Sequence, residues 1–202
     1  MDAAEAAGWA PLALAEQFFI GGATLVQLRA KRLASGPFLD LCDAVVALGR
    51  AHGAGVLVND RVDLAVLSRA AGAHVGQDDL APAAARALLG PDAILGCSTH
   101  DAAQAAQAAA EPVTYIAVGP IFATRTKDTG YQPVGLELVR QARRLAPACP
   151  IVAIGGITLD TAPAVLAAGA TAVAIITDLL AHGDPAARVA SYNRLASARP
   201  GG

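Results

Sequence analysis

Short runs of β-branched residues alternate along this chain with alanine- and leucine-rich segments of helical period. Near-continuous valine and isoleucine runs are typical of parallel strands that helices cover on both faces. The sequence predicts strands at residues 24–29, 56–59, 73–75, 94–97, 115–119, 151–154 and 172–176. It predicts helices at residues 11–20, 37–52, 61–70, 82–89, 101–110, 136–145, 161–167 and 185–197, several of them with Ser35, Asp60, Asp101 or Thr161 as the N-cap. The expected fold class is therefore α/β.

A short Ala/Gly motif recurs at the start of three of these strands, in the segments HGAGVLV, AAGAHV and AAGATAV. Repetition at the spacing of one strand–helix unit favours a (β/α)8 barrel or a doubly wound sheet. A closed barrel needs eight strands, but the chain opens directly into a helix, so we expect a TIM barrel whose first strand is missing or replaced. No linker or change of composition divides residues 1–202, which we expect to form a single domain.

Composition excludes several classes of protein. Hydrophobic residues make up 54% of the chain and charged residues 16%, which is not the composition of a disordered protein. A formal net charge of −2 argues against a nucleic-acid partner. The sequence has no signal-peptide pattern and no uninterrupted apolar stretch of about 18 residues, so no membrane partner is expected. Cys42, Cys97 and Cys149 form no CxxC pair, which fits reduced thiols in a cytoplasmic protein.

Polar residues follow the predicted strands, at the edge of a parallel sheet where ligands bind. Gln27, Arg29 and Lys31 recur at every second position, so in an extended chain their side chains would point to one face. Asn59 and Asp60 follow the next strand.

Asp79 follows the third strand, so that two aspartates, Asp60 and Asp79, are expected at neighbouring strand ends. Two carboxylates with basic groups nearby suit a Mg²⁺ ion that also binds substrate phosphates. The alternative is that both aspartates only cap helices.

The chain has fifteen basic residues but only two lysines, Lys31 and Lys127, and both come just after predicted strands. A compact ammonium group is suited to phosphate, although two lysines can also fall on loops by chance. Lys127 belongs to the segment GPIFATRTKDTG, whose hydroxyls and charges indicate a functional loop rather than a solvent loop.

Two later strand ends also suggest phosphate binding. Gly155 and Gly156 either form a simple turn or let the backbone approach a phosphate closely. Thr177 begins a short helix after the last strand, as in the phosphate sites of many barrels.

His74 is expected to line the interior, and His100 either binds substrate or caps the next helix. Ser98 lacks a GxSxG motif, and no His or Cys pattern indicates zinc.

Taken together, these motifs resemble the thiamine phosphate synthase family of (β/α)8 barrels, over the stretch from about Gly21 to Leu180. The resemblance implies a transferase of thiamine biosynthesis. It would join 4-amino-2-methyl-5-hydroxymethylpyrimidine diphosphate to hydroxyethylmethylthiazole phosphate and release pyrophosphate. No protein nucleophile is expected in such a reaction.

The resemblance also implies roles for individual residues. The pyrimidine diphosphate would be bound by Gln27, Arg29, Lys31, Asn59, Ser98 and Lys127. The thiazole phosphate would be bound by Thr124, Arg125, Thr126, Gly156, Ile176 and Thr177. Asp60 and Asp79, rather than Asp78, would hold Mg²⁺. Arg29, Lys31 and Lys127 would act catalytically, by stabilising charge on the leaving pyrophosphate.

This sequence departs from the family pattern at Ala30, where the family has an acidic residue, at Thr177, where it has serine, and in the missing first strand. The second hypothesis is accordingly a non-catalytic or regulatory barrel that binds a thiazole or pyrimidine phosphate. The third hypothesis is a different phosphate-binding barrel, such as a tryptophan-biosynthesis isomerase. It would need a general acid/base pair at opposite strand ends, and we find no such pair in the sequence. The expected partners are small phosphorylated substrates. The sequence does not determine the oligomeric state, and a homo-oligomer is one of the possibilities.

Overall fold

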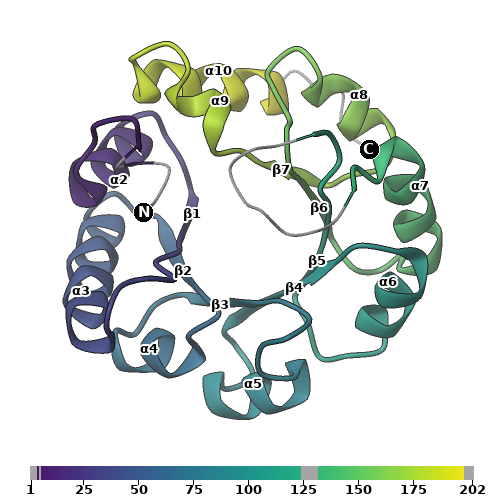
Figure 1. Cartoon of the computed structure of the whole chain (residues 1–202), viewed down its shortest axis with the longest axis horizontal. Coiled ribbons are helices and arrows are strands. Elements are labelled where there is room, and N and C mark those ends of the chain that lie inside the picture. The colour runs from purple at the N-terminus through teal and green to yellow at the C-terminus, as the bar shows by residue number, and fades with distance from the viewer. Residues whose placement is uncertain (1–3, 5, 124–131, 198–202) are drawn as a thin grey trace.

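Strands and helices alternate in the computed structural model, except that two helices in succession follow the last strand. The structure describes residues 4, 6–123 and 132–197. Viewed down its shortest axis, the molecule has an inner arc of strands and an outer ring of helices (Figure 1). The strands are β1 (Leu25–Leu28), β2 (Gly55–Asn59), β3 (Gly72–Val75), β4 (Ile94–Thr99), β5 (Tyr115–Val118), β6 (Ile151–Ile154) and β7 (Ala172–Ala174). The helices are α2 (Pro11–Ile20), α3 (Ser35–Ala51), α4 (Val62–Leu67), α5 (Pro82–Leu89), α6 (Ala102–Ala109), α7 (Gly135–Leu145), α8 (Ala162–Ala167), α9 (Thr177–Leu180) and α10 (Pro185–Ser197). The predicted α/β class is confirmed.

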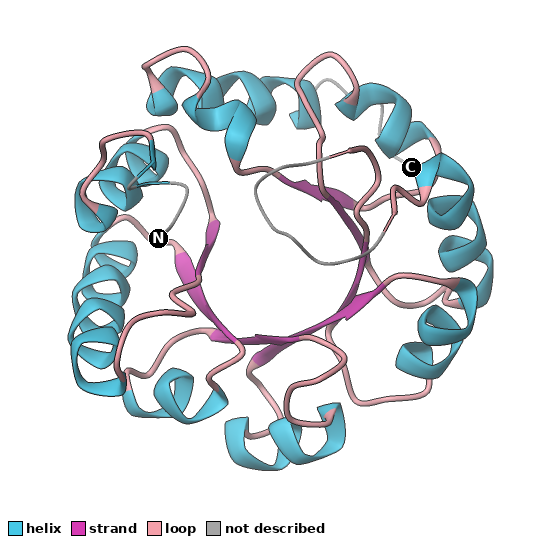
Figure 2. Cartoon of the chain, in the orientation of Figure 1, coloured by secondary structure: helices cyan, strands magenta, loops and turns pink. Residues whose placement is uncertain are grey.

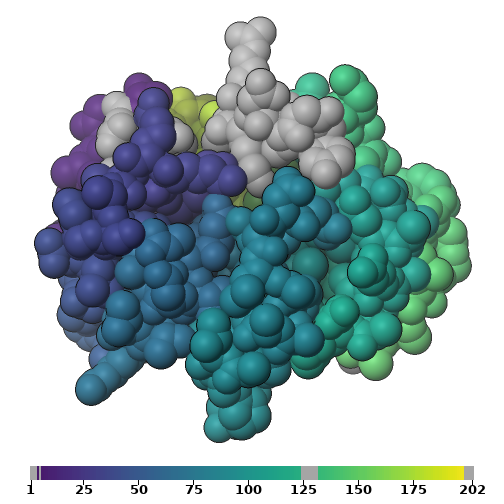
Figure 3. All heavy atoms as spheres, turned by 60° about the horizontal axis from the view of Figure 1, so that its bottom comes forward, coloured from purple at the N-terminus to yellow at the C-terminus, as the bar shows by residue number. Residues whose placement is uncertain are grey.

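The strands form one parallel sheet in chain order, from β1 to β7. Parallel neighbours need a crossover connection, and the crossover helices all lie on the outer side of the sheet (Figure 2). Between the sheet and the helices lies the main core, in which Val58 and Val75 are fully buried. The inner face carries a smaller cluster around Leu57 and Tyr115. In the space-filling view the outer wall follows chain order, from purple through teal to green (Figure 3).

The described residues leave an open seam in the sheet between β1 and β7. β1 pairs with β2 and β7 with β6, and no pairing joins β1 to β7 in the part of the chain that the structure describes. Side chains of these two strands are partly exposed, whereas those of β3 and β5 are all buried. A barrel of the predicted kind, lacking its first strand, has this arrangement.

The ring of helices closes over the seam, because α10 packs against the end of α2. The Asn193 side-chain amide donates hydrogen bonds to the carbonyl oxygens of Gly21 and Gly22, at 3.1 and 2.9 Å. A Cβ atom on Gly21 would lie 2.5 Å from the Ala186 carbonyl oxygen and 2.7 Å from Val189 Cβ. Only glycine allows α10 to approach the chain this closely.

Helices α2, α5 and α10 have the bounds predicted from the sequence. The Asp101 carboxylate accepts a hydrogen bond from the Gln104 N–H at 2.8 Å, so it caps α6 as predicted. The prediction that Ser35 is an N-cap was wrong, because Ser35 is itself the first residue of α3. Asp60 does not cap α4 either, since Arg61 takes the N-cap position there.

Candidate active site

The predicted site residues that are described gather along one rim, because parallel strands have their carboxyl ends on the same side. Those assigned to the diphosphate and the metal lie in or just after β1 to β4: Gln27, Arg29, Lys31, Asn59, Asp60, Asp79 and Ser98. Gly156, Ile176 and Thr177 follow β6 and β7. Thr124, Arg125, Thr126 and Lys127 lie outside the described residues.

Lys31, Asp60 and Asp79 meet at this rim, although they belong to three successive units of the chain. The Lys31 Nζ atom lies 3.3 Å from Asp60 Oδ2. Asp79 lies close enough to Asp60 for its charge and hydrogen bonding to raise the pKa of the Asp60 carboxyl group. Asp79 is held in turn by the Gly76 N–H, which donates to its Oδ2 atom at 2.8 Å. We call Asp60 and Asp79 the acidic pair.

The acidic pair is electrostatically unfavourable by itself. Burial raises the pKa of Asp60, and the hydrogen bond and like charge of Asp79 raise it further, against the opposing effect of Lys31. Asp60 also has a φ of 63°, held by its N–H, which donates to the His74 carbonyl oxygen at 2.8 Å. Aspartate tolerates left-handed backbone better than most residues. Two carboxylates brought together in this way favour a cation beside them.

Within the described ranges, no group of three or more His, Cys, Asp or Glu side chains is placed to hold a metal ion. Mg²⁺ is commonly bound by one or two carboxylates together with substrate phosphates and water. The acidic pair supplies that number of protein ligands. Its donor set therefore fits an ion shared with a phosphorylated substrate better than a closed structural site.

A chain of polar groups crosses the inner face of the sheet below the rim. The His74 ring bonds to the Tyr115 hydroxyl through Nδ1 at 2.8 Å and to the Ser98 hydroxyl through Nε2 at 2.7 Å. A Cβ atom on Gly96 would lie 2.1 Å from the Tyr115 ring, so glycine makes room for this pair. Burial raises the pKa of Tyr115, and a hydrogen bond with Gln27 opposes the rise. His74 lines the interior as predicted, and it orients Ser98.

The sequence predicts that the side chains of Gln27, Arg29 and Lys31 lie on one face of an extended strand, but the strand does not include all three residues. β1 ends at Leu28, and the chain turns after it, with the Leu33 N–H donating to the Ala30 carbonyl oxygen at 3.3 Å. The turn, rather than strand alternation, directs Lys31 to Asp60. Ala30 is only 7% exposed, so an acidic side chain at this position would be buried beside the turn.

On the opposite side of the rim, the turn after β6 packs closely on the segment after β5. Gly155 and Gly156 have φ values of 100° and 64°, which favour glycine. A Cβ atom on Gly156 would lie 2.6 Å from the Ala123 carbonyl oxygen. The Phe122 N–H donates to the Gly155 carbonyl oxygen at 3.0 Å. These contacts fix the turn. Because Gly156 is exposed, the backbone of the turn is open to a ligand at the rim.

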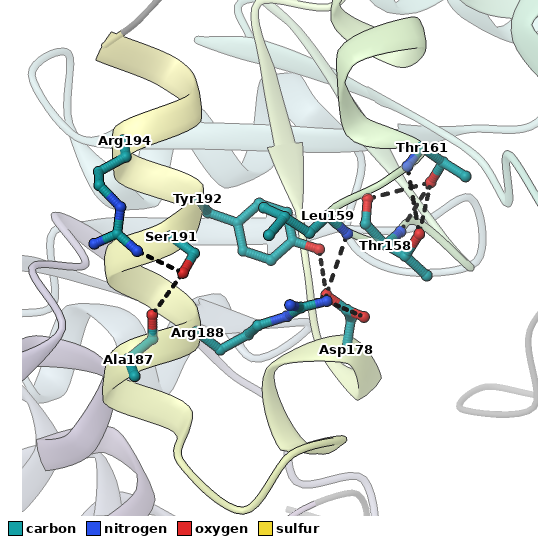
Figure 4. Close-up of polar contacts among 9 residues, drawn as sticks. All are labelled: Thr158, Leu159, Thr161, Asp178, Ala187, Arg188, Ser191, Tyr192 and Arg194. Atoms are coloured by element: carbon teal, nitrogen blue, oxygen red, sulfur yellow. Dashed lines mark hydrogen bonds and ion pairs between the residues drawn. The ribbon is translucent and has the colours of Figure 1, made fainter.

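Sequence reasoning assigned no role of its own to Asp178, the second residue of α9. Its carboxylate accepts hydrogen bonds from Arg188 Nε and Nη2 at 2.9 and 3.0 Å, from the Tyr192 hydroxyl at 2.6 Å and from the Leu159 N–H at 3.3 Å (Figure 4). Burial tends to raise the pKa of Asp178, but the hydrogen bonds from Arg188 and Tyr192 outweigh it and lower the pKa. We call Asp178, Arg188 and Tyr192 the Asp178 cluster.

Comparisons with known proteins show which family this chain belongs to. The family model of thiamine monophosphate synthase matches residues 3–179. A thiamine-phosphate synthase of Chlorobium phaeovibrioides is 44% identical over 178 residues, which cover 87% of this chain and 83% of that protein. One of Moorella thermoacetica is 46% identical over 167 residues, covering 83% and 79%. The solved thiamine phosphate pyrophosphorylase of Pyrococcus furiosus superposes with a TM-score of 0.85 at 26% identity, covering 93% of this chain and 90% of that one. This chain belongs to the thiamine monophosphate synthase family.

Proposed function

We propose that this protein is a thiamine phosphate synthase, a transferase that makes thiamine phosphate and pyrophosphate from the pyrimidine diphosphate and the thiazole phosphate named above. The observation that carries the proposal is the meeting of Lys31 with the acidic pair at the rim of the sheet. A site of one ammonium group and two carboxylates suits a diphosphate bound together with a divalent cation. Membership of the family supplies the identity of the substrates.

The pyrimidine diphosphate is assigned to the β1–β4 side of the rim. Asn59 is buried and Ser98 half-buried on the inner face, where they can hydrogen-bond the pyrimidine, and Gln27 of β1 lies opposite Leu57. Arg29 and Lys31 are assigned to the diphosphate, as is Lys127 from the sequence alone. Arg29 is half-buried, and its Nε atom is buried.

The family is in general metal-dependent, and the acidic pair is the candidate for holding the metal ion, which we propose is Mg²⁺. A bound Mg²⁺ would neutralise charge on the diphosphate and make pyrophosphate a better leaving group. Lys31 and Arg29 contribute to the same stabilisation from the protein, because their positive charges lie at the rim where negative charge develops.

The chemistry needs positioning and charge stabilisation more than protein nucleophiles. The bond between the methylene carbon of the pyrimidine and the diphosphate oxygen breaks, and pyrophosphate leaves with the electron pair. The thiazole nitrogen then donates its lone pair to that carbon, which forms the new carbon–nitrogen bond. The electron-rich aminopyrimidine can carry the positive charge between these two events. The task of the site is to hold the nitrogen opposite the carbon.

The phosphate of the thiazole substrate is assigned to the β6–β7 side of the rim. Gly156 offers exposed backbone after β6, and Thr177 offers a hydroxyl and an N–H at the start of α9. Ile176 is 44% exposed and supplies an apolar surface for the thiazole ring. Thr124, Arg125 and Thr126 are assigned to the same substrate from the sequence alone. The two substrates would then face each other across the rim.

Within the described residues, no helix is both long and apolar enough to cross a membrane. We assign the protein to the cytoplasm, where its three cysteines would stay reduced. The partners assigned to it are its small phosphorylated substrates.

The direct test supplies purified protein with both substrates, with and without Mg²⁺, and follows the appearance of thiamine phosphate and pyrophosphate. We expect stoichiometric formation of the two products that depends on Mg²⁺. A folded protein that binds either substrate but forms no thiamine phosphate would contradict the proposal. That result would favour a non-catalytic barrel that binds a thiazole or pyrimidine phosphate.

A further inference from the structure

The Asp178 cluster joins three segments that are distant in the sequence. Asp178 belongs to α9, Arg188 and Tyr192 belong to α10, and Leu159 lies in the loop between β6 and α8. Figure 4 shows the Arg188 and Tyr192 side chains reaching from α10 toward the carboxylate, and the loop backbone approaching it from the other side. A single carboxylate thus fixes the distance between the loop after β6 and the helix after β7.

Both of these segments carry residues assigned to the thiazole phosphate. Asp178 is the neighbour of Thr177, and Leu159 comes three residues after Gly156. The Asp178 side chain is only 9% exposed and that of Arg188 21%, so solvent screens their interaction weakly. The carboxylate itself is committed to four hydrogen bonds inside the protein. Its role toward the substrate is therefore indirect.

The loop after β6 is fixed at a second point as well. The Thr158 N–H donates to the Thr161 hydroxyl at 2.9 Å, one residue before the N–H that donates to Asp178. Ile157 is 5% exposed and anchors the loop in the core. The backbone of residues 157–159 is thus held by burial and by two side chains, which leaves Gly156 in a defined place above it.

We propose that Asp178, held by Arg188 and Tyr192, is a positioning residue that sets the spacing between Gly156 and Thr177 and thereby the affinity for the phosphate of the thiazole substrate. The inference rests on the proposed function. A preorganised phosphate site loses affinity when its donors move apart by a fraction of an ångström to about 1 Å. The residues assigned to the diphosphate, in β1–β4, have no contact with this cluster among the described hydrogen bonds.

The test compares the KM values of the two substrates in variants of the cluster. Asp178→Asn removes the charge, and Tyr192→Phe removes one hydrogen bond while it keeps the packed ring. Glu137→Gln is the matched control, because Glu137 also pairs with two arginines, but on the exposed surface of α7. We expect the KM for the thiazole phosphate to rise roughly tenfold or more in Asp178→Asn and less in Tyr192→Phe. The KM for the pyrimidine diphosphate should stay within about twofold.

A cluster that only stabilises the fold would give a different result. Loss of stability with both KM values unchanged, or an equal rise of both KM values, would overturn the inference. Arg188→Lys adds a geometric control, since lysine keeps the charge but cannot form the paired hydrogen bonds. We expect it to raise the KM for the thiazole phosphate, whereas a purely electrostatic role would leave that KM at the wild-type value.

A binding measurement separates this inference from the proposed function. Inorganic phosphate, added without the other substrate, should protect the wild type and Glu137→Gln against thermal unfolding and should protect Asp178→Asn much less. If the three proteins show this pattern of protection but the wild type forms no thiamine phosphate, the reaction is wrongly assigned and the positioning role stands. Equal protection of wild type and Asp178→Asn would overturn the positioning role.

Discussion

Asp60 combines a left-handed backbone conformation with a like-charged neighbour, and both conditions cost free energy in the folded protein. Unfavourable local arrangements of this kind concentrate at functional sites, where a ligand compensates for them. The nearby Lys31 offsets only part of the repulsion, because its side chain is half exposed. A divalent cation should therefore stabilise the protein more at the acidic pair than at the other described charged groups.

The matched substitutions Asp79→Asn and Asp78→Asn test this at the residue scale. Asp78 is adjacent and exposed, whereas Asp79 belongs to the acidic pair. We expect Mg²⁺ with pyrophosphate to stabilise the wild type and Asp78→Asn, by about 2.7 kcal/mol at a hundredfold excess over Kd, and not Asp79→Asn. Thermal unfolding with and without the two ligands measures the effect. A full shift in Asp79→Asn would show that the metal binds elsewhere.

The pH dependence of the same shift follows from the raised pKa of Asp60. A carboxyl group with a raised pKa in the folded state favours folding below its unfolded pKa, and this contribution is lost as pH rises through the folded pKa. Without metal, the acidic pair therefore destabilises the protein at neutral pH. The stabilisation by Mg²⁺ and pyrophosphate should shrink as pH falls through the pKa of Asp60, because protonation competes with the metal.

At this scale, the sequence predicts residues whose chemistry is rare and whose place at a strand end is clear. Lys31, Asp60 and Asp79 are of this kind. The Asp178 cluster could not be predicted, because its members lie 10 and 14 residues apart and meet only through the packing of α10 on α9. The hydrogen bond from His74 to Ser98 could not be predicted either, since it depends on the register of β3 with β4.

At the scale of elements, the contact between α2 and α10 depends on the missing side chain of Gly21. Its φ of −69° is open to any residue, so only the space around it demands glycine. Gly36 in α3 is the matched control, because a Cβ atom there would meet nothing within 4 Å.

We expect Gly21→Ala to lower the free energy of unfolding by about 1–3 kcal/mol through overpacking against Ala186 and Val189. Gly36→Ala should leave it unchanged or raise it by up to about 1 kcal/mol, because alanine is the better helix former. Denaturant unfolding of both variants measures the difference. Equal stability of the two variants would mean that α10 does not press on α2.

Most strands could be predicted because each is a short apolar run with a clear end. β4 runs two residues past its predicted end, to Thr99, whereas β7 stops at Ala174 although the predicted run continues to Ile176. For β7 the reason lies in the next element, because Ile176 becomes the N-cap of α9 with φ −130° and ψ −75°. Local propensity favours a strand for Ile175 and Ile176, but the start of α9 takes the chain out of the sheet.

At the scale of the whole molecule, the ends of the seven strands in the described residues form a rim with two proposed binding sides. The β1–β4 side carries the acidic pair and Lys31, and the β6–β7 side carries Gly156 and Thr177. Strand counting could predict the parallel arc and the seam that it leaves between β1 and β7 in the described residues. It could not predict that α10 closes the ring of helices onto α2, because this contact joins segments about 170 residues apart.

The most direct measurement is a crystal structure of the protein with Mg²⁺, pyrophosphate and thiamine phosphate. The account predicts that Mg²⁺ is bound by Asp60 and Asp79 with pyrophosphate beside Lys31. It predicts that the phosphate of thiamine phosphate lies against Gly156 and Thr177, across the rim. Pyrophosphate and metal bound away from the acidic pair, or a thiamine phosphate seated on the outer ring of helices, would contradict it.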